Sequence, residues 1–231
     1  MGRLALHSVR TIGTDVYDLL RQDILNLQRK PGEPIDSNQL AGELRVSRAP
    51  VRDALMRLRT EGLVHMLPQR GTYVSRISLQ RVGEECFLRK SLELSVIPHF
   101  LKRSGPQAMA AFQKCIQEQK DALESGDYLW LQRCDDAFHG VLFLVANKAM
   151  CWNLIQSESG HYQRIRLLSL WQRDISSNVV DEHVAIMEAA RQKDEAGLSL
   201  ILRSHLSRLV DQERQLVEAY PHYFDDSAAC L

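Results

Sequence analysis

The sequence predicts a mainly α-helical fold in two domains, and three observations lead to this prediction. The chain has 231 residues, whereas a single compact domain usually has about 100–150. Apolar residues recur at helical spacing along most of the chain, and only residues 63–77 have a strand-like pattern. We therefore expect an N-terminal domain over residues 1–76, in which helices are followed by a hairpin, and an antiparallel all-helical bundle over residues 77–231.

Composition excludes several classes of protein. The chain is 45% hydrophobic and 25% charged, which is usual for globular proteins, and no stretch approaches the roughly 18 apolar residues of a membrane span. The N-terminus shows no signal-peptide pattern. The five cysteines are scattered, without a C-x-x-C pair, which favours a reducing compartment over a disulfide framework or a thiolate zinc site. We expect a cytoplasmic protein with no membrane partner.

The net charge of zero hides an asymmetry between the two domains. Residues 1–76 carry 12 Lys and Arg against 8 Asp and Glu, whereas residues 77–231 carry 17 against 21. Within residues 45–76 the count is 7 basic to 2 acidic. This distribution favours a polyanion-binding domain joined to a domain with another task.

The first domain begins with two helical segments. Apolar spacing over residues 13–28 predicts a helix, which the prolines and glycine of KPGEPI bring to an end. Asp36 or Ser37 can then cap a short helix that contains Leu40 and Leu44.

The stretch VSRAPVRDALMRL, residues 46–58, predicts a third helix. Ser47 is a favourable N-cap residue. Pro50 falls in the first turn, where a missing N–H costs no intrahelical hydrogen bond. The face that we expect to be buried carries Val51, Leu55 and Leu58.

Strand-like segments follow the third helix. Residues 63–67 and 72–77 flank the sequence PQRG, in which Pro68 and Gly71 favour a turn. The order helix, short helix, helix, hairpin is that of a winged helix-turn-helix, whose second paired helix enters the major groove of DNA.

Two arginines lie near the start of the third helix. Arg48 and Arg52 could belong to an ordinary solvated face, which is the usual meaning of surface charge. A cation near a helix N-terminus opposes the macrodipole, however, at a cost of about 0.3–1 kcal/mol, so helix stability does not account for Arg48. Arginines at this position can bond guanine or clamp phosphates, and DNA binding is therefore the favoured interpretation.

Residues 40–75, LAGELRVSRAPVRDALMRLRTEGLVHMLPQRGTYVS, resemble the DNA-binding domain of the GntR family of bacterial transcription regulators. The shared signature is V-S-R-x-P-V-R-x-A-L, followed by G-L-V and by a glycine and a valine of the wing. The resemblance implies that DNA contacts are made by Ser47, Arg48, Pro50 and Arg52 on the recognition helix, and by Arg70 and Gly71 at the wing tip.

From residue 79 onward the pattern is only helical. Helices are predicted over residues 79–104, 106–125, 127–146, 149–171, 178–191 and 194–219. The short breaks between them are typical of antiparallel neighbours in a bundle. The tail, PHYFDDSAACL, is expected to be frayed.

Three histidines and one aspartate occupy inward positions of these helices. Asp135 and His139 are four residues apart and share a helix face, and His183 and His205 lie on the apolar stripes of two later helices. Any one of them alone could be a core residue that is hydrogen-bonded to a neighbour. Burying four such groups is costly unless they pair or hold a metal, and imidazoles with one carboxylate suit Zn, Ni, Mn or Fe(II).

The arrangement resembles the metal-binding type of the FCD domain, the helical effector domain of the FadR subgroup of the GntR family. That type carries D-x-x-x-H, E-H-x-x-I and R-x-H-L segments, and this chain has DDAFH, EHVAI and RSHL. Other FCD domains bind long acyl chains instead, but the intact set favours a metal. The resemblance assigns the divalent metal to Asp135, His139, His183 and His205.

An arginine of the same domain is a candidate for effector binding. The segment RKSLE matches the family's R-x-x-L-E and implies that Arg89 lies near the effector cavity, although a salt bridge with Glu93 would also explain the pair. Arg164 and Arg166 are weaker candidates for contact with an anionic ligand.

Taken together, these features predict a DNA-binding transcriptional repressor rather than an enzyme. We expect a homodimer that binds palindromic double-stranded operator DNA, with affinity controlled by a small organic acid at the metal site. A metal-dependent enzyme is one alternative, but the chain has no H-E-x-x-H motif. A regulator for which the metal is the signal, or is only structural, is another.

Overall fold

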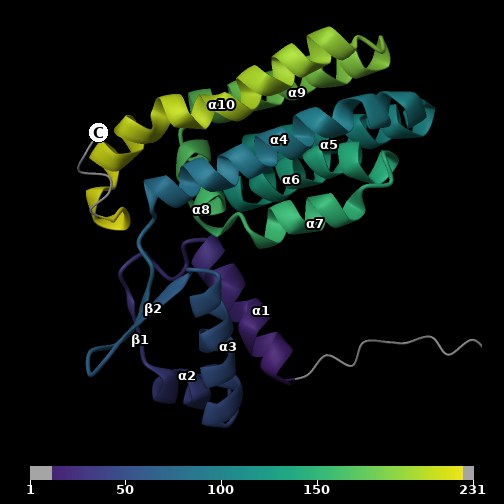
Figure 1. Cartoon of the computed structure of the whole chain (residues 1–231). Helices are drawn as coiled ribbons and strands as arrows, with labels where there is room; N and C mark the ends of the chain where they lie inside the picture. Colours follow the sequence, from purple (N-terminus) through teal and green to yellow (C-terminus); the bar gives the residue numbers. More distant parts are fainter. Residues whose placement is uncertain (1–11, 226–231) are drawn as a thin grey trace, which may run out of the picture. The chain divides into compact units, whose positions relative to one another are not determined.

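The computed structural model describes residues 12–225, except for the side chains at positions 12, 210 and 211. The chain forms two compact units, Met1–Arg76 and Ile77–Leu231 (Figure 1), and each unit has its own hydrophobic core. Within the described residues, no helix is both long enough and apolar enough to cross a membrane.

The N-terminal unit combines three helices with a small sheet. Its elements are α1 (Ile12–Leu25), β1 (Pro34–Ile35), α2 (Ser37–Glu43), α3 (Arg48–Thr60), β2 (Val64–Leu67) and β3 (Gly71–Val74). The strands are antiparallel and lie in the order β1-β3-β2. The predicted winged helix-turn-helix is confirmed, with α2 and α3 as the paired helices and the β2–β3 hairpin as the wing.

The two paired helices differ in how they begin. The Asp36 carboxylate accepts hydrogen bonds from the N–H groups of Asn38 and Gln39 and so caps α2. Arg45, with φ 54°, turns the chain between the two helices. Ser47 occupies the N-cap position of α3 with extended backbone, but its side chain makes no capping hydrogen bond.

Helix α3 packs one face against α1. Val51, Leu55 and Leu58 are at most 2% exposed, and Leu20 and Ile24 of α1 are fully buried. Burying each such side chain contributes about 1.5–3 kcal/mol. This face matches the predicted stripe, and it leaves the opposite face of α3 to the solvent.

Strand β1 differs from the prediction, in which KPGEPI is only a break. Pro34 pairs with Tyr73 and Ile35 pairs with Thr72, and Ile35 is 5% exposed. Two residues are too few to show an alternating pattern. The strand therefore depends on its pairing with β3, which no local signal reveals.

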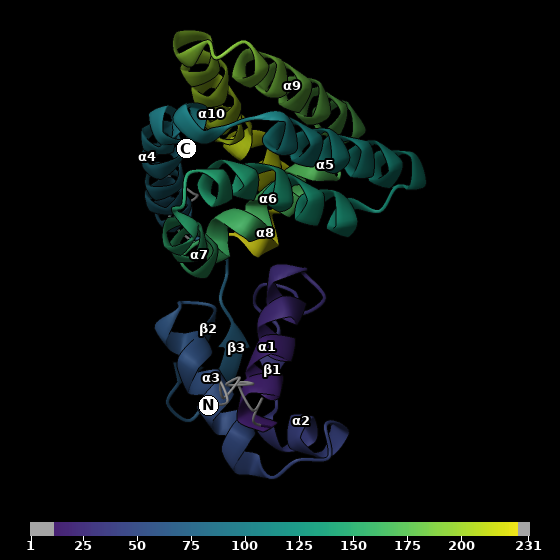
Figure 2. The ribbon, with the colours of Figure 1, turned by 90° about the vertical axis from the view of Figure 1, so that its right-hand side faces the viewer.

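The C-terminal unit is the predicted helical bundle. Long helices lie side by side, with two shorter helices beside them (Figures 1 and 2). The elements are α4 (Leu79–Arg103), α5 (Pro106–Ser125), α6 (Tyr128–Val145), α7 (Ala149–Ser157), α8 (Gly160–Leu170), α9 (Arg173–Arg191), α10 (Glu195–Ala219) and the 3-10 turn η1 (Pro221–Tyr223).

The single helix predicted over residues 149–171 is two helices, α7 and α8. Glu85 of α4 accepts hydrogen bonds from the N–H groups of His161 and Tyr162 at 2.9 and 2.7 Å. A carboxylate thus satisfies the donors at the start of α8 and complements its dipole. All eleven residues of α8 are buried, so this helix has no solvent-facing side.

Aromatic rings form the centre of the bundle core. Phe100 and Phe112 lie 5.6 Å apart between ring centroids, Phe112 and Phe138 lie 4.6 Å apart, and all three are fully buried. They join α4, α5 and α6 in one apolar cluster.

The expectation of a frayed tail is wrong for residues 221–225. The N–H of Ile77 bonds the carbonyl of Tyr223 at 2.7 Å, and the N–H of Asp225 bonds the carbonyl of Ile77 at 3.1 Å. Phe224 is 2% exposed. The first residue of the unit therefore pairs with its last described residues, and the remainder of the tail lies outside the described part.

We expect Phe112→Ala to lower the free energy of unfolding by about 3–5 kcal/mol, because it removes a fully buried ring from the aromatic cluster. Phe87, which is 74% exposed on α4, provides the matched control. Phe87→Ala should change the free energy of unfolding by less than about 0.5 kcal/mol. Urea denaturation followed by circular dichroism measures both, and equal losses would contradict the assignment of the core.

Candidate metal centre and nucleic-acid interface

The four predicted metal ligands meet inside the C-terminal unit. Helix α6 supplies Asp135 and His139, α9 supplies His183, and α10 supplies His205, and one ligand atom from each lies within 4.8 Å of the others. His139 and His183 are fully buried and Asp135 is 4% exposed. Their polar atoms must therefore be satisfied inside the protein.

Each imidazole uses its Nδ1 atom to bond an oxygen outside the cluster. Such partners fix the tautomer and the orientation of the ring, and they are typical of metal-ligating histidines. The three contacts are His139 to Glu93 Oε2 at 2.6 Å, His183 to Gln119 Oε1 at 2.8 Å, and His205 to Glu182 Oε2 at 2.6 Å.

The opposite ring nitrogens face one another. The Nε2 atoms of His139 and His205 are 3.1 Å apart, and the buried Nε2 of His183 has no hydrogen-bond partner. Because acceptor oxygens hold the Nδ1 protons, neutral rings direct only lone pairs at this point. Asp135 Oδ1 lies 3.5 Å from Nε2 of His183. These residues fit a divalent cation, which would accept all four donors.

Burial keeps the imidazoles in the form that binds metal. Desolvation lowers the pKa of His205 to about 4 and holds the pKa values of His139 and His183 below the ordinary value. Burial alone would raise the pKa of Asp135, but the surrounding groups, of which Arg166 acts most strongly, together outweigh burial and keep that pKa well below its usual range. Neutral imidazoles beside a carboxylate are the protonation states that metal binding requires.

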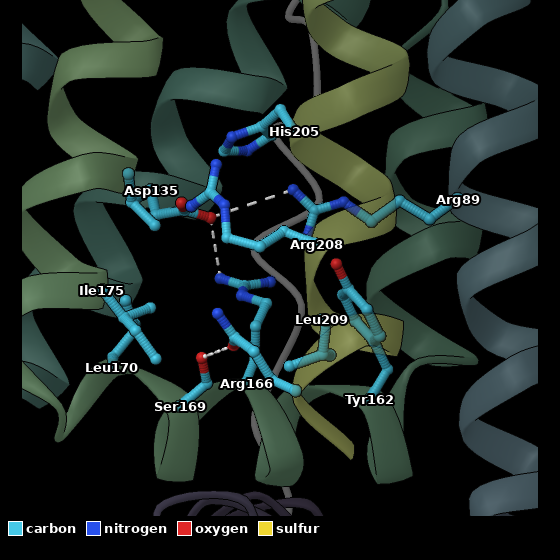
Figure 3. A pocket seen from close by; sticks show the side chains of 12 residues that line it. Arg89, Asp135, Tyr162, Arg166, Ser169, Leu170, Ile175, His205, Arg208 and Leu209 are labelled. Carbon is cyan, nitrogen blue, oxygen red and sulfur yellow. Dashed lines mark hydrogen bonds and ion pairs between the residues drawn. The ribbon is translucent and has the colours of Figure 1, made fainter. Parts of the chain in front are cut away.

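A cavity of about 40 Å³ adjoins this cluster, and Asp135 and His205 form part of its wall (Figure 3). Arginines reach it from three helices: Arg89 from α4, Arg166 from α8 and Arg208 from α10. A space of this size holds a few water molecules, so it suits a small anion better than a long acyl chain. The cavity is completed by Tyr162, Ser169 and Gln212 and by apolar residues that include Ile175 and Val179.

Arg89, the predicted effector residue, both lies at a cavity and forms a salt bridge with Glu93. It lines the cavity, and its Nε bonds Glu93 Oε1 at 2.6 Å. The side chains are 2% and 0% exposed, so the pair is buried rather than a surface salt bridge. A buried arginine that is paired and still faces a cavity remains a candidate for contact with an anion.

The two weaker arginine candidates separate in the structure. Arg166 lines the cavity and bonds Asp135 and Asp136, each at 2.8 Å. Arg164 is fully buried, bonds the carbonyl of Gly160 at 3.2 Å and is absent from the residues that line the cavity.

Sequence reasoning missed several residues of this site. Arg208 lies one helical turn after His205, and this spacing could have indicated it. Glu93 stands inside the R-x-x-L-E segment, where it was considered only as a partner of Arg89. Glu182 likewise stands inside the E-H-x-x-I segment, directly before His183. No comparable signal marks Gln119, Tyr162, Ser169 or Gln212.

The predicted DNA-binding residues lie on α3 and on the wing of the other unit. Ser47, Arg48 and Arg52 are exposed and Pro50 is half-buried. The Arg52 side chain is 75% exposed. At the wing, Arg70 and Gly71 are exposed, and Gly71 adopts φ 104°, which favours glycine.

Two open grooves with shared lining residues bring the arginines of α3 and of the wing together on one surface. The first groove contains Arg48 and Arg52, the second contains Arg70, and Ser37 and Thr72 line both grooves. A continuous exposed surface with three arginines can bind the phosphates and base edges of a DNA groove.

Another arginine of α3 serves the packing of the domain. The Arg57 guanidinium lies 3.6 Å from the centre of the Tyr17 ring, and Arg21 bonds Glu61 at 2.8 Å nearby. The Tyr17 hydroxyl also bonds Glu61. The charges near the end of α3 are thus partly structural, whereas those near its start face the solvent.

Comparison with known proteins identifies both units. Residues 12–74 match the family described as bacterial regulatory proteins, gntR family, and residues 86–208 match the FCD domain. The chain is 30% identical over 223 residues to an HTH-type transcriptional regulator in an unstable DNA locus of Streptomyces ambofaciens, which covers 96% of this chain and 93% of that protein.

Further similarities extend over the whole length. The HTH-type transcriptional repressor RspR of Escherichia coli K12 is 25% identical over 221 residues, which are 96% of this chain and 97% of that protein. The solved structure of E. coli McbR/YncC has the same fold, with a TM-score of 0.75 at 20% identity over 92% of this chain and 100% of that chain. The Streptomyces protein and RspR are both named as transcription regulators. The chain therefore belongs to the GntR family of bacterial transcription regulators, in the FadR-like subgroup with a C-terminal FCD domain.

Proposed function

We propose that this GntR-family regulator is a repressor whose affinity for its operator is controlled by a small carboxylate bound beside a divalent metal. Residues 1–76 would bind DNA, and residues 77–231 would bind the effector and form a homodimer. The observation that carries the proposal is the approach of the His139 and His205 Nε2 atoms to 3.1 Å, with both Nδ1 atoms already bonded to carboxylates.

The DNA-binding part of the proposal concerns the exposed face of α3 and the wing. Arg48 and Arg52 would meet base edges or phosphates, and Ser47 and Pro50 would set the start of the helix against the DNA. Helix-turn-helix proteins usually match a palindromic operator with a two-fold dimer, and the similar E. coli protein is named a repressor. Such a regulator would act in the cytoplasm.

The effector-binding part concerns the arginine-lined cavity. Arg89, Arg166 and Arg208 would hold the carboxylate groups of a small organic acid, because guanidinium groups match carboxylates in geometry and charge. The ligands Asp135, His139, His183 and His205 would hold Zn, Ni, Mn or Fe, and a bound metal would supply open positions for effector oxygens. An effector that binds one arrangement of the dimer more tightly than another would shift the dimer toward that arrangement and so change its affinity for the operator.

Two other roles for the metal make different demands on the site. An enzyme would need a general base near the ligands, but the carboxylates nearest to the imidazoles, Glu93 and Glu182, are bonded to His139 and His205. A purely structural metal would not need arginines from three helices beside it. The cavity therefore favours an effector site.

Arg52→Ala should weaken operator binding about 10–100-fold, because a base or phosphate contact is lost while the buried face of α3 is unchanged. Duplexes selected from random DNA by the wild-type protein would supply the operator, and fluorescence anisotropy would measure its affinity. Arg214→Ala is the matched control, since its side chain is 77% exposed on α10 and should leave affinity unchanged. Equal affinity of Arg52→Ala and wild type would exclude this use of α3.

His183→Ala should abolish stoichiometric Zn²⁺ binding, because it removes a buried ligand from the centre of the cluster. Elemental analysis and isothermal titration with Zn²⁺ measure the occupancy. The control is His99→Ala, which removes an exposed imidazole of α4 and should bind metal like the wild type. Full occupancy in His183→Ala would reject the metal assignment.

The metal-loaded protein should bind a small di- or tricarboxylic acid and should lose operator affinity when it does so. Titration calorimetry with a panel of organic acids, followed by anisotropy with the selected operator, measures both effects. His183→Ala should still bind DNA but should not respond to the acid. If the metal-loaded protein bound none of the acids yet released DNA on metal removal, the metal itself would be the signal.

A further inference from the structure

The arginines of the cavity and the candidate metal ligands are joined by carboxylates that serve both. Arg89, Arg166 and Arg208 each pair with an acidic side chain that also belongs to the cluster or to its bonded partners. We call these acidic residues the shared carboxylates, and they are Glu93, Asp135 and Glu182.

Glu93 connects Arg89 to His139 through its two oxygens. Its Oε1 accepts from Arg89 Nε at 2.6 Å, and its Oε2 bonds His139 Nδ1 at 2.6 Å. The negative charge is therefore divided between a guanidinium and an imidazole.

Glu182 makes the same connection on the other side of the cluster. Its Oε2 bonds His205 Nδ1 at 2.6 Å and also forms an ion pair with Arg208. Glu182 is 31% exposed, so it is the shared carboxylate that can be changed with the least disturbance of the core.

Asp135 provides the third connection, and His183 provides the contrast. The Oδ2 atom of Asp135 accepts from Arg166 at 2.8 Å and lies 3.8 Å from Arg89. His183 instead bonds the neutral Gln119 at 2.8 Å. His183 is thus the one histidine of the three whose outer partner carries no charge.

We propose that the shared carboxylates couple the anion cavity to the metal centre, so that anion and metal each raise the affinity for the other. Glu93 and Glu182 are then positioning residues, which act on the metal through His139 and His205. An anion that binds the Arg208 guanidinium replaces Glu182 in the ion pair with this arginine. The negative charge of Glu182 then acts on His205 alone and makes that imidazole a stronger metal ligand. By linkage, a metal on His205 favours the anion to the same extent.

This coupling rests on the proposed function, because it requires both sites. It also adds to that function, since it operates without direct contact between effector and metal. In the absence of an anion, the shared carboxylates form ion pairs with the arginines. These ion pairs compete with anion binding and lower the affinity of the metal-free protein for anions.

Glu182→Gln tests the coupling, because it retains an acceptor for His205 but removes the charge. We expect Zn²⁺ affinity to fall roughly 10–100-fold, as when other outer partners of metal ligands are lost. The metal-free variant should bind succinate about tenfold more tightly, because Arg208 no longer has a competing carboxylate. Competition with a chromophoric chelator measures Zn²⁺ binding, and calorimetry measures succinate binding.

Gln119→Leu is the matched control, since it removes the outer partner of His183, which is neutral and forms no ion pair with an arginine. It should also weaken Zn²⁺ binding, but it should leave succinate binding to the metal-free protein unchanged. The coupling would be supported if Glu182→Gln weakened Zn²⁺ binding and tightened succinate binding, and Gln119→Leu did not show this combination. Unchanged or weaker succinate binding in Glu182→Gln, or equal tightening in Gln119→Leu, would overturn it.

Arg208→Gln completes a double-mutant cycle and remains informative if Glu182→Gln does not fold. It should tighten Zn²⁺ binding about threefold or more, and this gain should disappear in the double variant. A gain of equal size in both backgrounds would mean that Arg208 acts on the cation directly, and no gain in the single variant would likewise overturn the coupling. Absence of Zn²⁺ binding by the wild type would refute the proposed function itself, and the coupling with it.

Discussion

The orientation of three imidazoles is the constraint on which the C-terminal domain depends. His139, His183 and His205 bond outward through Nδ1, so their Nε2 atoms must face inward. The oxygens that hold them come from α4, α5 and α9, and the rings themselves come from α6, α9 and α10. Five helices therefore have to keep their relative positions if the cluster is to exist, and the connections between them follow from this requirement.

Stability and function are divided between neighbouring layers of the same bundle. Phe138 stacks on His183 with 4.1 Å between ring centroids and also packs on Phe112, so the apolar cluster directly supports the polar one. A buried network of charges contributes little net stability by itself, whereas the aromatic core does contribute. The fold can therefore hold a buried polar centre because adjacent apolar residues stabilise the surrounding bundle.

The sequence predicted features that depend on neighbours along the chain and missed those that depend on distant ones. Periodicity placed the buried face of α3, and short motifs placed Asp135, His139, His183 and His205 together. Strand β1, the break before α8 and the ordered residues 221–225 rest on pairing with β3, on Glu85 and on Ile77. Among the outer partners of the histidines, Glu93 and Glu182 stand inside the motifs RKSLE and EHVAI, although the motifs do not show which histidine each one bonds. Gln119 has no such signature, because a lone glutamine in a helix gives no local signal.

The burial of every residue of α8 limits which residues around the cavity can change without disturbing the core. Tyr162 and Arg166 face the cavity from a helix whose other sides are packed, so a change there disturbs the core and the ligand site together. Ile175, on α9, and Gln212, on α10, reach the same cavity from helices that also have exposed positions. For the proposed effector site, changes in ligand preference should therefore arise first through α9 and α10, where a substitution disturbs the core least.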